Sequence, residues 1–252
     1  MIVTNEAELS MLLQVGRVVA ETLHKMVVEV RAGISTKELD VIGEAYLSSK
    51  GARSAPRLTY GFPGSTCISV NDVVAHGIPS ADVLLQEGDI VNIDVSAELD
   101  GFWADNGASV VVGKDINGRQ PLVDHSLATL RGAAALCQSG RRINSVGGFI
   151  EQSAKKAGFK IIKNLGGHGI GRALHEEPGD ILNFRDGTDK RRFRKGAVVA
   201  IETFFNTRST LAIEQSDGFT LLGNRGGSGA QHEVSLVITD GPPIILTPIL
   251  YA

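Results

Sequence analysis

The sequence predicts an α+β fold in which two pairs of helices cover a curved antiparallel β-sheet. Amphipathic helical patterns come in two pairs, and each pair is followed by strand-like runs that are mostly joined by hairpins. The order helix, helix, strands therefore occurs twice, which predicts a duplication with pseudo-two-fold halves at about residues 5–115 and 121–252. No low-complexity segment or linker interrupts this pattern. We expect a single domain over residues 1–252, without a targeting segment or an extra N-terminal domain.

The helices are expected from their start and stop signals. Asn5 followed by Glu8, and Ser35 followed by Glu38, have the spacing of a capping box at a helix N-terminus. Apolar residues at helical spacing follow both pairs. The four expected helices cover residues 5–33, 35–51, 121–138 and 144–158, the last opened by Asn144 or Ser145.

Strands are expected where short apolar or alternating runs lie between turn residues. In the first half they cover residues 67–70, 73–75, 90–99 and 102–112. In the second half they cover residues 159–163, 197–205, 210–214, 218–222 and 230–239.

An Asp-Gly pair at Asp100–Gly101 separates two of these strands. Such a pair between apolar runs is the strongest short-range signal for a β-hairpin with a two-residue type I′ loop. In that register Asp94 opposes Gly107 and Asp105 opposes Ser96, so the two aspartates point to one face as diagonal neighbours. Diagonal neighbours lie about 7–8 Å apart at the backbone, and two-metal sites hold their ions about 3.5–4 Å apart. One aspartate could therefore bridge two ions while the other binds one of them.

Two glutamates and a histidine are further candidates for a metal site. Glu202 lies inside an apolar run, and burial of a carboxylate is costly unless it is paired, hydrogen-bonded or bound to a cation. Glu233 also lies near apolar residues, but it has more polar neighbours than Glu202. His168 lies among four glycines in residues 164–172, where the backbone can approach a ligand closely. A dinucleotide-binding glycine loop is the alternative for this segment, but the G-x-G-x-x-G spacing is not met.

His175 and His76 are two further candidates for a site. His175 follows the glycine segment, and Pro178 argues against a helix that continues through it. It could be a third metal ligand, a catalytic group or a surface residue, and its position near the glycine segment favours a role in the site. His76 ends an apolar strand beside a turn, where functional side chains are commonly presented, but a structural role fits it equally well.

Together these residues indicate metal-dependent hydrolysis. The donor set is rich in oxygen and lacks thiolates, which suits Mn²⁺, Fe²⁺, Co²⁺ or Zn²⁺. Two such ions lower the pKa of a bridging water and polarise a carbonyl group. No Gly-x-Ser-x-Gly elbow is present, and neither cysteine has a convincing histidine base beside it in sequence, so a nucleophilic side chain is the weaker hypothesis.

The composition argues against several classes of protein. A formal charge of −3 disfavours a protein that mainly binds nucleic acid. The basic run 190–195 is a local exception; we interpret it as a solvated loop, with an anionic partner such as a ribosome surface as the alternative. The two cysteines cannot form a disulfide framework, and there is no signal peptide or apolar run of about 20 residues. We expect a cytoplasmic protein. The sequence has no coiled-coil heptad that would favour an oligomer, so we also expect a monomer.

Several segments resemble those of the type I methionine aminopeptidases, a group within the pita-bread metallopeptidases. They are residues 67–79, 91–95, 167–171, 174–178 and 230–233, and they follow the order found in that group. The resemblance spans nearly the whole chain. It implies a pita-bread fold and the removal of the initiator methionine from nascent polypeptides, with a small second residue preferred. A hydroxide that bridges two divalent ions would attack the first peptide carbonyl.

The resemblance also implies roles for individual residues. Asp94 would bind the second ion, and Asp105 and Glu233 would bridge both ions. His168 and Glu202 would complete the coordination of the first ion, and Glu202 would also be the proton shuttle.

The remaining implied residues contact the substrate or a further cation. His76 and His175 would contact the substrate amide and stabilise the tetrahedral intermediate. The apolar pocket for the methionine side chain would be lined by Phe62, Cys67, Leu174 and Phe219. A monovalent cation would be bound by backbone carbonyls near Asn71, Val73 and Gly229.

The chain departs from the pattern of this group at positions next to the ligands. At the position of Asn106, members of that group commonly have Thr, and at that of Thr203 they commonly have Pro. They commonly have His-Thr in place of Val234–Ser235, and Trp in place of Phe219. All five ligands remain, so we expect altered metal affinity and rate rather than another reaction. A proline-directed aminopeptidase or dipeptidase of the same fold is one alternative, although it would usually carry an extra N-terminal domain. A non-catalytic binding protein of this fold is the other.

Overall fold

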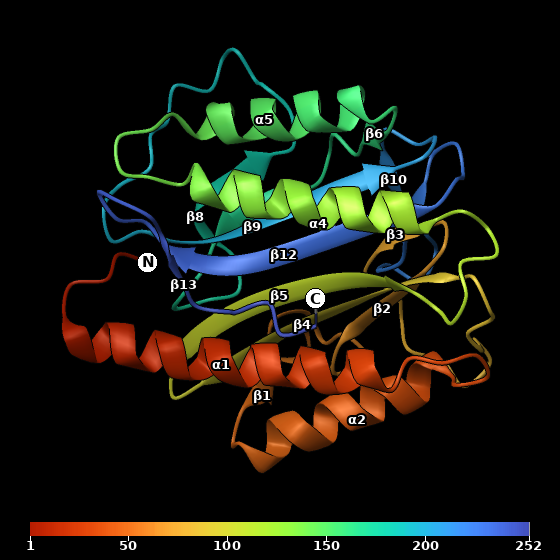
Figure 1. Ribbon diagram of the computed structural model, residues 1–252. Helices are drawn as coiled ribbons and strands as arrows, with labels where there is room; N and C mark the ends of the chain where they lie inside the picture. The colour runs from red at the N-terminus through yellow and green to blue at the C-terminus, as the bar shows by residue number, and fades with distance from the viewer. Residues whose placement is uncertain (252) are drawn as a thin grey trace.

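The structure is a computed structural model that describes residues 1–251, and it has the predicted α+β class. Two antiparallel sheets lie side by side, and a pair of helices covers each of them (Figure 1). A short additional helix lies next to the first pair. The helices are α1 (Glu6–Val28), α2 (Thr36–Ser49), α3 (Ala55–Tyr60), α4 (Gln120–Ala135) and α5 (Ile143–Lys156).

The described strands form two large sheets and one small sheet. The first sheet contains β1 (Arg53–Ser54), β2 (Cys67–Val70), β4 (Ile90–Leu99) and β5 (Phe102–Val111), with β4 at its centre. The second sheet contains, in spatial order, β13 (Ile244–Ile245), β12 (Gly229–Val237), β9 (Val198–Asn206), β7 (Gly166–Gly169) and β8 (Glu176–Leu182), and β6 (Lys160–Ile161) also pairs with β9. The small sheet contains β10 (Ala212–Glu214), β11 (Leu221–Gly223) and β3 (Val73–Ala75). It joins the two predicted halves, whose duplication stays a prediction.

The first two helices begin where the sequence predicts. The side chain of Ser35 accepts a hydrogen bond from the N–H of Glu38 (3.1 Å), and the Glu38 carboxylate accepts one from the N–H of Ser35 (2.8 Å), so this capping box is complete. At α1 the Asn5 side chain accepts from the N–H of Glu8 (2.9 Å). The Glu8 carboxylate, however, accepts from the N–H of Thr4 (2.8 Å), so only half of the predicted box forms.

Two predicted helix boundaries were wrong because tertiary hydrogen bonds compete with local signals. α1 ends at Val28 rather than near Gly33, whose N–H donates to the carbonyl of Leu85 (2.8 Å) and so draws the chain away from the helix. α5 begins before Asn144. The Asn144 side chain donates to two backbone carbonyls in the loop after β8 instead of capping the helix.

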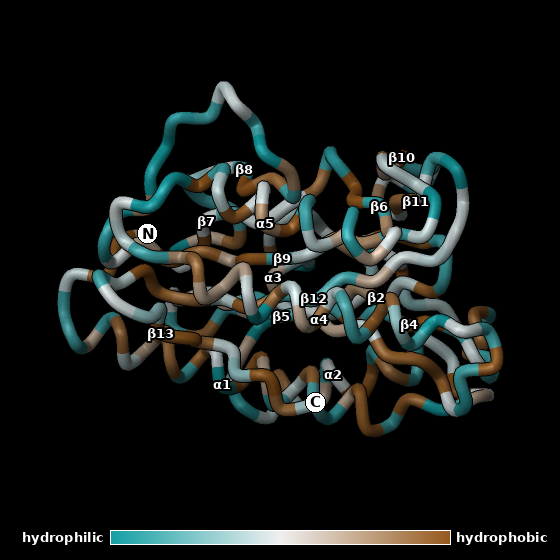
Figure 2. Tube along the Cα trace, turned by 45° about the horizontal axis from the view of Figure 1, so that its top comes forward, coloured by the Kyte–Doolittle hydropathy of each residue, from teal (hydrophilic) through white to brown (hydrophobic). Residues whose placement is uncertain are grey.

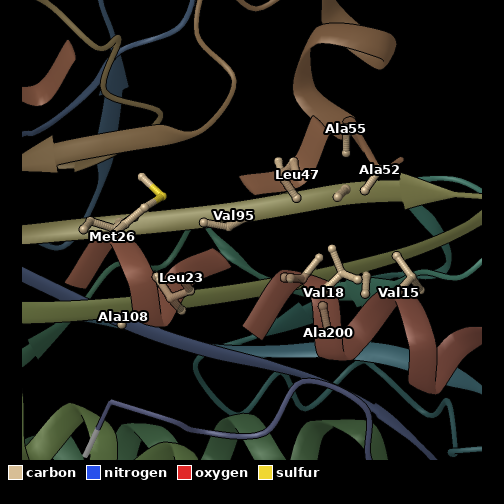
Figure 3. Packing of buried hydrophobic residues seen from close by; sticks show 14 of the residues in the cluster. Val15, Val18, Leu23, Met26, Leu47, Ala52, Ala55, Val95, Ala108 and Ala200 are labelled. Carbon is tan, nitrogen blue, oxygen red and sulfur yellow. The ribbon is translucent and has the colours of Figure 1, made fainter. Parts of the chain in front are cut away.

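The core of the first half lies between α1 and the sheet formed by β4 and β5. Leu23 and Met26 of α1 are fully buried in one cluster with Val95 of β4 and Ala108 of β5 (Figure 3). Full burial of a side chain such as Leu or Met contributes about 1.5–3 kcal/mol. This packing holds β4 and β5 rigidly, and the side chains on their opposite face form part of the site described below.

The segment between β8 and β9 is a hydrophilic loop that projects from the body of the molecule (Figure 2). The basic run 190–195 lies in it, and all its charged side chains are exposed. Arg191 pairs with Asp189 (3.0 Å) and Lys195 with Asp240 (2.5 Å). These contacts agree with the interpretation of this run as a solvated loop. Within residues 1–251, no helix is long and apolar enough to span a membrane.

Candidate metal centre and substrate pocket

The β4–β5 hairpin has the register predicted from Asp100–Gly101. Both turn residues have positive φ (51° and 80°), as a type I′ loop requires. Asp94 pairs with Gly107 and Asp105 with Ser96. Because directly opposed residues share a face, the carboxylates of Asp94 and Asp105 lie on the same side of the hairpin.

The second sheet brings the other three candidates to the same place. Glu202 of β9 and Glu233 of β12 are directly opposed, and His168 of β7 pairs with Ala200, two residues before Glu202. β12 lies beside β5 (Figure 1), so the carboxylates of both sheets converge. All five candidates line one cavity of about 460 Å³. We call Asp94, Asp105, His168, Glu202 and Glu233 the ligand cluster.

The centre of this cluster has distances that suit a metal ion. Ligand atoms of Asp105, His168 and Glu233 all lie within 4.8 Å of one another. His168 Nε2 is 3.9 Å from Asp105 Oδ2 and 4.0 Å from Glu233 Oε1. The other ring nitrogen, Nδ1, donates a hydrogen bond to the carbonyl of Gly169 (3.0 Å), which leaves the Nε2 lone pair facing the carboxylates. Burial lowers the pKa of His168 to about 4, so this imidazole is neutral at pH 7.

The carboxyl groups of the cluster are held in an environment that disfavours their charge. Burial raises the pKa of Asp94 to about 6, partly offset by contact with Asp105. Burial and neighbouring carboxylates raise the pKa values of Asp105, Glu202 and Glu233 well above their usual range. Among the described residues, Asp105 Oδ1 and Glu233 Oε1 are buried without any hydrogen-bond partner. Divalent cations would satisfy these oxygens and remove the charge repulsion, so the donor set fits them.

Two amide side chains that the sequence analysis did not single out orient these carboxylates. Gln231 Nε2 donates to Glu233 Oε2 (3.0 Å) and to Glu202 Oε2 (3.3 Å). Asn92 Nδ2 donates to Gln231 Oε1 (2.8 Å), which fixes the Gln231 amide with its N–H groups toward the glutamates. Gln231 stands two residues before Glu233 on β12 and therefore on the same face, a signal that strand periodicity offers.

The glycines around His168 have a different role from the one expected. This segment is the strand β7 rather than a loop that admits a ligand. A Cβ atom on Gly167 would lie 2.3 Å from the carbonyl oxygen of Ala200, and one on Gly169 would lie 2.4 Å from that of Glu177. The groups that approach these two glycines closely are therefore neighbouring backbone segments rather than a ligand.

The mouth of the cavity is lined by three residues outside the large strands, which we call the pocket rim: Tyr60, His76 and His175. His76 follows β3 with a positive φ of 53°. The His175 ring lies 4.2 Å from the His168 ring, between centroids, and Tyr60 Oη lies 2.6 Å from His175 Nδ1. Burial lowers the pKa values of His76 and His175, so both imidazoles are neutral at pH 7. The structure thus brings both histidines to the site, together with Tyr60, which was not predicted from the sequence.

Part of the cavity lining is apolar. Phe62 and Phe219 pack edge to face with ring centroids 5.2 Å apart, and Cys67 and Leu174 also line the cavity; we call these four residues the apolar wall. Phe62, Cys67 and Leu174 are buried. Burial raises the pKa of the Cys67 thiol well above its usual range, which makes it an apolar lining group rather than a nucleophile.

Residues that depart from the resemblance lie around the cluster. Thr203 Oγ1 hydrogen-bonds Ser126 Oγ (2.9 Å) beneath α4. Ser235 Oγ contacts the backbone of Asp105 (2.9 Å). The Asn106 side chain is fully buried without a hydrogen-bond partner among the described residues, and nothing in the structure explains this.

Comparison with known proteins is consistent with this geometry. The model of Metallopeptidase family M24 matches residues 10–240. The chain belongs to this family. It is 44% identical to Methionine aminopeptidase 2 of Bacillus subtilis (strain 168) over 249 residues, which cover 99% of this chain and 100% of that protein.

Solved structures of other M24-like proteins have the same fold. A methionine aminopeptidase from Thermotoga maritima matches with a TM-score of 0.93 and 28% identity, over 98% of this chain and 99% of that one. One from Rickettsia prowazekii matches with a TM-score of 0.92 and 30% identity, over 98% and 100%. The predicted family and pita-bread fold are thereby confirmed, and as a metallopeptidase the chain depends on a divalent metal.

Proposed function

We propose that this M24 metallopeptidase removes the N-terminal methionine from polypeptides whose second residue is small. One observation supports this most directly: the apolar wall and the ligand cluster line the same cavity. An apolar wall that contains two aromatic rings suits a flexible thioether side chain. The relatives named methionine aminopeptidase support the same assignment.

The ligand cluster would hold two divalent ions. Asp105 and Glu233 would be shared between them, Asp94 would serve one ion, and His168 with Glu202 the other. When bound, such ions polarise the scissile carbonyl and lower the pKa of a coordinated water. The Gln231 amide keeps Glu202 and Glu233 in position by its two hydrogen bonds.

The remaining site residues act on the substrate. His76 and His175 would donate hydrogen bonds to the substrate amide and stabilise the developing charge on its carbonyl oxygen. If Tyr60 donates to Nδ1 of His175, the proton of that neutral imidazole is on Nε2, where it can be donated to substrate. Glu202 would accept and return a proton during hydrolysis. The substrates would be nascent polypeptides.

The test is hydrolysis of Met-Ala-Ser and Met-Lys-Ser peptides by purified protein with Mn²⁺ or Co²⁺. We expect methionine release from the first peptide, little from the second, and none after chelation. Absence of metal-dependent release from Met-Ala-Ser would refute the proposal. Hydrolysis of X-Pro peptides instead would select a proline-directed enzyme, and protein without stoichiometric metal would select a binding module.

A further inference from the structure

β5 and β12 are neighbours at the boundary between the two large sheets, but they are not joined as ordinary strands. Within residues 1–251, no backbone-to-backbone hydrogen bond links them. Two serine hydroxyls take the place of that ladder. We call this boundary the β5–β12 seam.

The two serines make the same contact in opposite directions. Ser109 of β5 accepts from the N–H of Gln231 (2.9 Å) and donates to the Gln231 carbonyl (2.9 Å). Ser235 of β12 accepts from the N–H of Asp105 (2.9 Å) and donates to the Asp105 carbonyl (2.9 Å). Each hydroxyl therefore satisfies both backbone groups of one residue on the other strand.

These contacts fix the register of the two strands at the ligand cluster. They align β5 and β12 as an antiparallel pair, with Gly107 opposite Glu233 midway between the two serine contacts. The Gln231 side chain packs directly over Gly107, where a Cβ atom would lie 2.2 Å from Gln231 Oε1. Ser235 hydrogen-bonds the backbone of Asp105 itself. Ser109 hydrogen-bonds the backbone of Gln231, whose side chain donates to Glu233.

Other polar side chains at the seam cannot replace the serines. Asn92 and Thr247 reach the carbonyls of Gln231 and Asp105 at 3.1 Å and 3.4 Å, but both act there as donors. Ser109 and Ser235 are buried, so their loss would leave a backbone N–H without a partner or force the strands to shift.

We propose that Ser109 and Ser235 are positioning residues of the metal centre, which set the separation and register of the two carboxylates that both ions would share. The inference rests on the proposed function, since it takes Asp105 and Glu233 as ligands. A substitution at either serine should weaken metal binding although neither side chain belongs to the ligand cluster.

The experiment is calorimetric titration of the metal-free full-length protein with MnCl₂. The variants are Ser109→Ala, Ser235→Ala and Ser235→Thr. Ser209→Ala is the matched control, because Ser209 is equally buried and its hydroxyl also accepts from one backbone N–H (Arg225, 2.9 Å) and donates to one carbonyl (Gly226, 2.7 Å). Thermal unfolding of each metal-free variant measures the loss of stability separately from the loss of affinity.

We expect each seam alanine variant to bind Mn²⁺ about 10–100-fold more weakly than the wild type, the range for residues that orient ligands. Ser235→Thr, which retains the hydroxyl, and Ser209→Ala should bind Mn²⁺ like the wild type. Equal affinity in the seam variants and the control would overturn the inference, as would a loss of affinity that follows the loss of thermal stability across all four variants. If the wild type itself binds no Mn²⁺ and releases no methionine, the proposed function fails instead.

Discussion

The ligand cluster and the pocket rim line the same cavity, but they are built differently. The cluster residues lie on β4, β5, β7, β9 and β12, where paired strands fix their direction. The rim residues lie at the end of α3, just after β3, and just before β8, and all three line the cavity but remain partly exposed to solvent. The charged groups thus lie on paired strands, whereas the groups that we propose to contact the substrate lie at or beside the ends of elements.

The two regions also differ in how burial affects them. Burial raises the pKa values of the cluster carboxyl groups, so their charge destabilises the fold unless a cation compensates it. At the rim, burial lowers the pKa values of His76 and His175 and leaves neutral hydrogen-bonding groups. We therefore expect the cluster, but not the rim, to depend on bound metal.

The largest effect is expected from a substitution in the cluster. Asp105→Asn keeps the size of the side chain but removes a charge that, in the proposed function, both ions would share. We expect loss of stoichiometric Mn²⁺ binding and a fall in peptide hydrolysis beyond the roughly 100-fold seen for residues that only orient ligands. Metal analysis and the Met-Ala-Ser assay measure the two outcomes. Asp124→Asn, on the exposed face of α4, is the control and should change neither.

A smaller effect, confined to catalysis, is expected at the rim. His175→Ala should lower kcat about 10²–10³-fold, the usual loss when a donor to the developing negative charge is removed. Tyr60→Phe removes only the hydrogen bond to His175, so a fall of about 2–10-fold is expected from a net value of about 0.5–1.5 kcal/mol. Both variants should bind Mn²⁺ like the wild type. Loss of metal in His175→Ala would instead make His175 a ligand and remove the distinction between cluster and rim.

The cluster could be predicted from the sequence because strand register is a local property. The Asp100–Gly101 turn fixes which residues of β4 and β5 are opposed, and alternation along each strand then decides which side chains share a face. Glu202 stood out as a carboxylate in a largely apolar run, and Glu233, which has polar neighbours, did so less clearly. The meeting of the two sheets, however, depends on packing between elements far apart in sequence, and here the resemblance to a known family supplied what local rules could not.

The rim and several elements near it could not be predicted in the same way. α3 is short and its start, at Ser54, was not recognised, so Tyr60 was missed. β7 consists largely of glycine and β8 contains Pro178, and both compositions disfavour strands by propensity. Tertiary pairing with β9 overrides that preference in β7. The role of Gln231 in orienting the glutamates was not predicted. An uncharged amide is less costly to bury than a carboxylate, so its position in a strand does not by itself indicate a site.

The smallest expected effect is on the stability of the metal-free protein. It tests whether burial disfavours the charge of the cluster carboxyl groups. A carboxyl group whose pKa is raised in the folded state binds more protons folded than unfolded, so stability falls as pH rises toward that folded pKa. Histidines with lowered pKa act in the opposite direction, but only below about pH 6.5, where the unfolded histidine is protonated. Between pH 6.5 and 8 we therefore expect the Tm of the metal-free protein to decrease, because the pKa values of Asp105, Glu202 and Glu233 are raised well above their usual range.

Metal should reverse this trend, because binding requires deprotonated carboxylates and so strengthens with pH. Mn²⁺ at 100 times its Kd adds about 2.7 kcal/mol, which corresponds to a rise in Tm of about 5–10 °C for a protein of this size. Differential scanning fluorimetry at pH 6.5, 7.25 and 8, with EDTA or with Mn²⁺, measures both trends. His175→Ala should behave like the wild type, whereas Asp105→Asn should show a shallower decrease without metal and no rise with it. A metal-free Tm that stays constant over this range would mean that the cluster carboxyl groups are already ionised in the folded protein, and one that increases would have the opposite sign to that expected. Either result would contradict the raised pKa values of these groups.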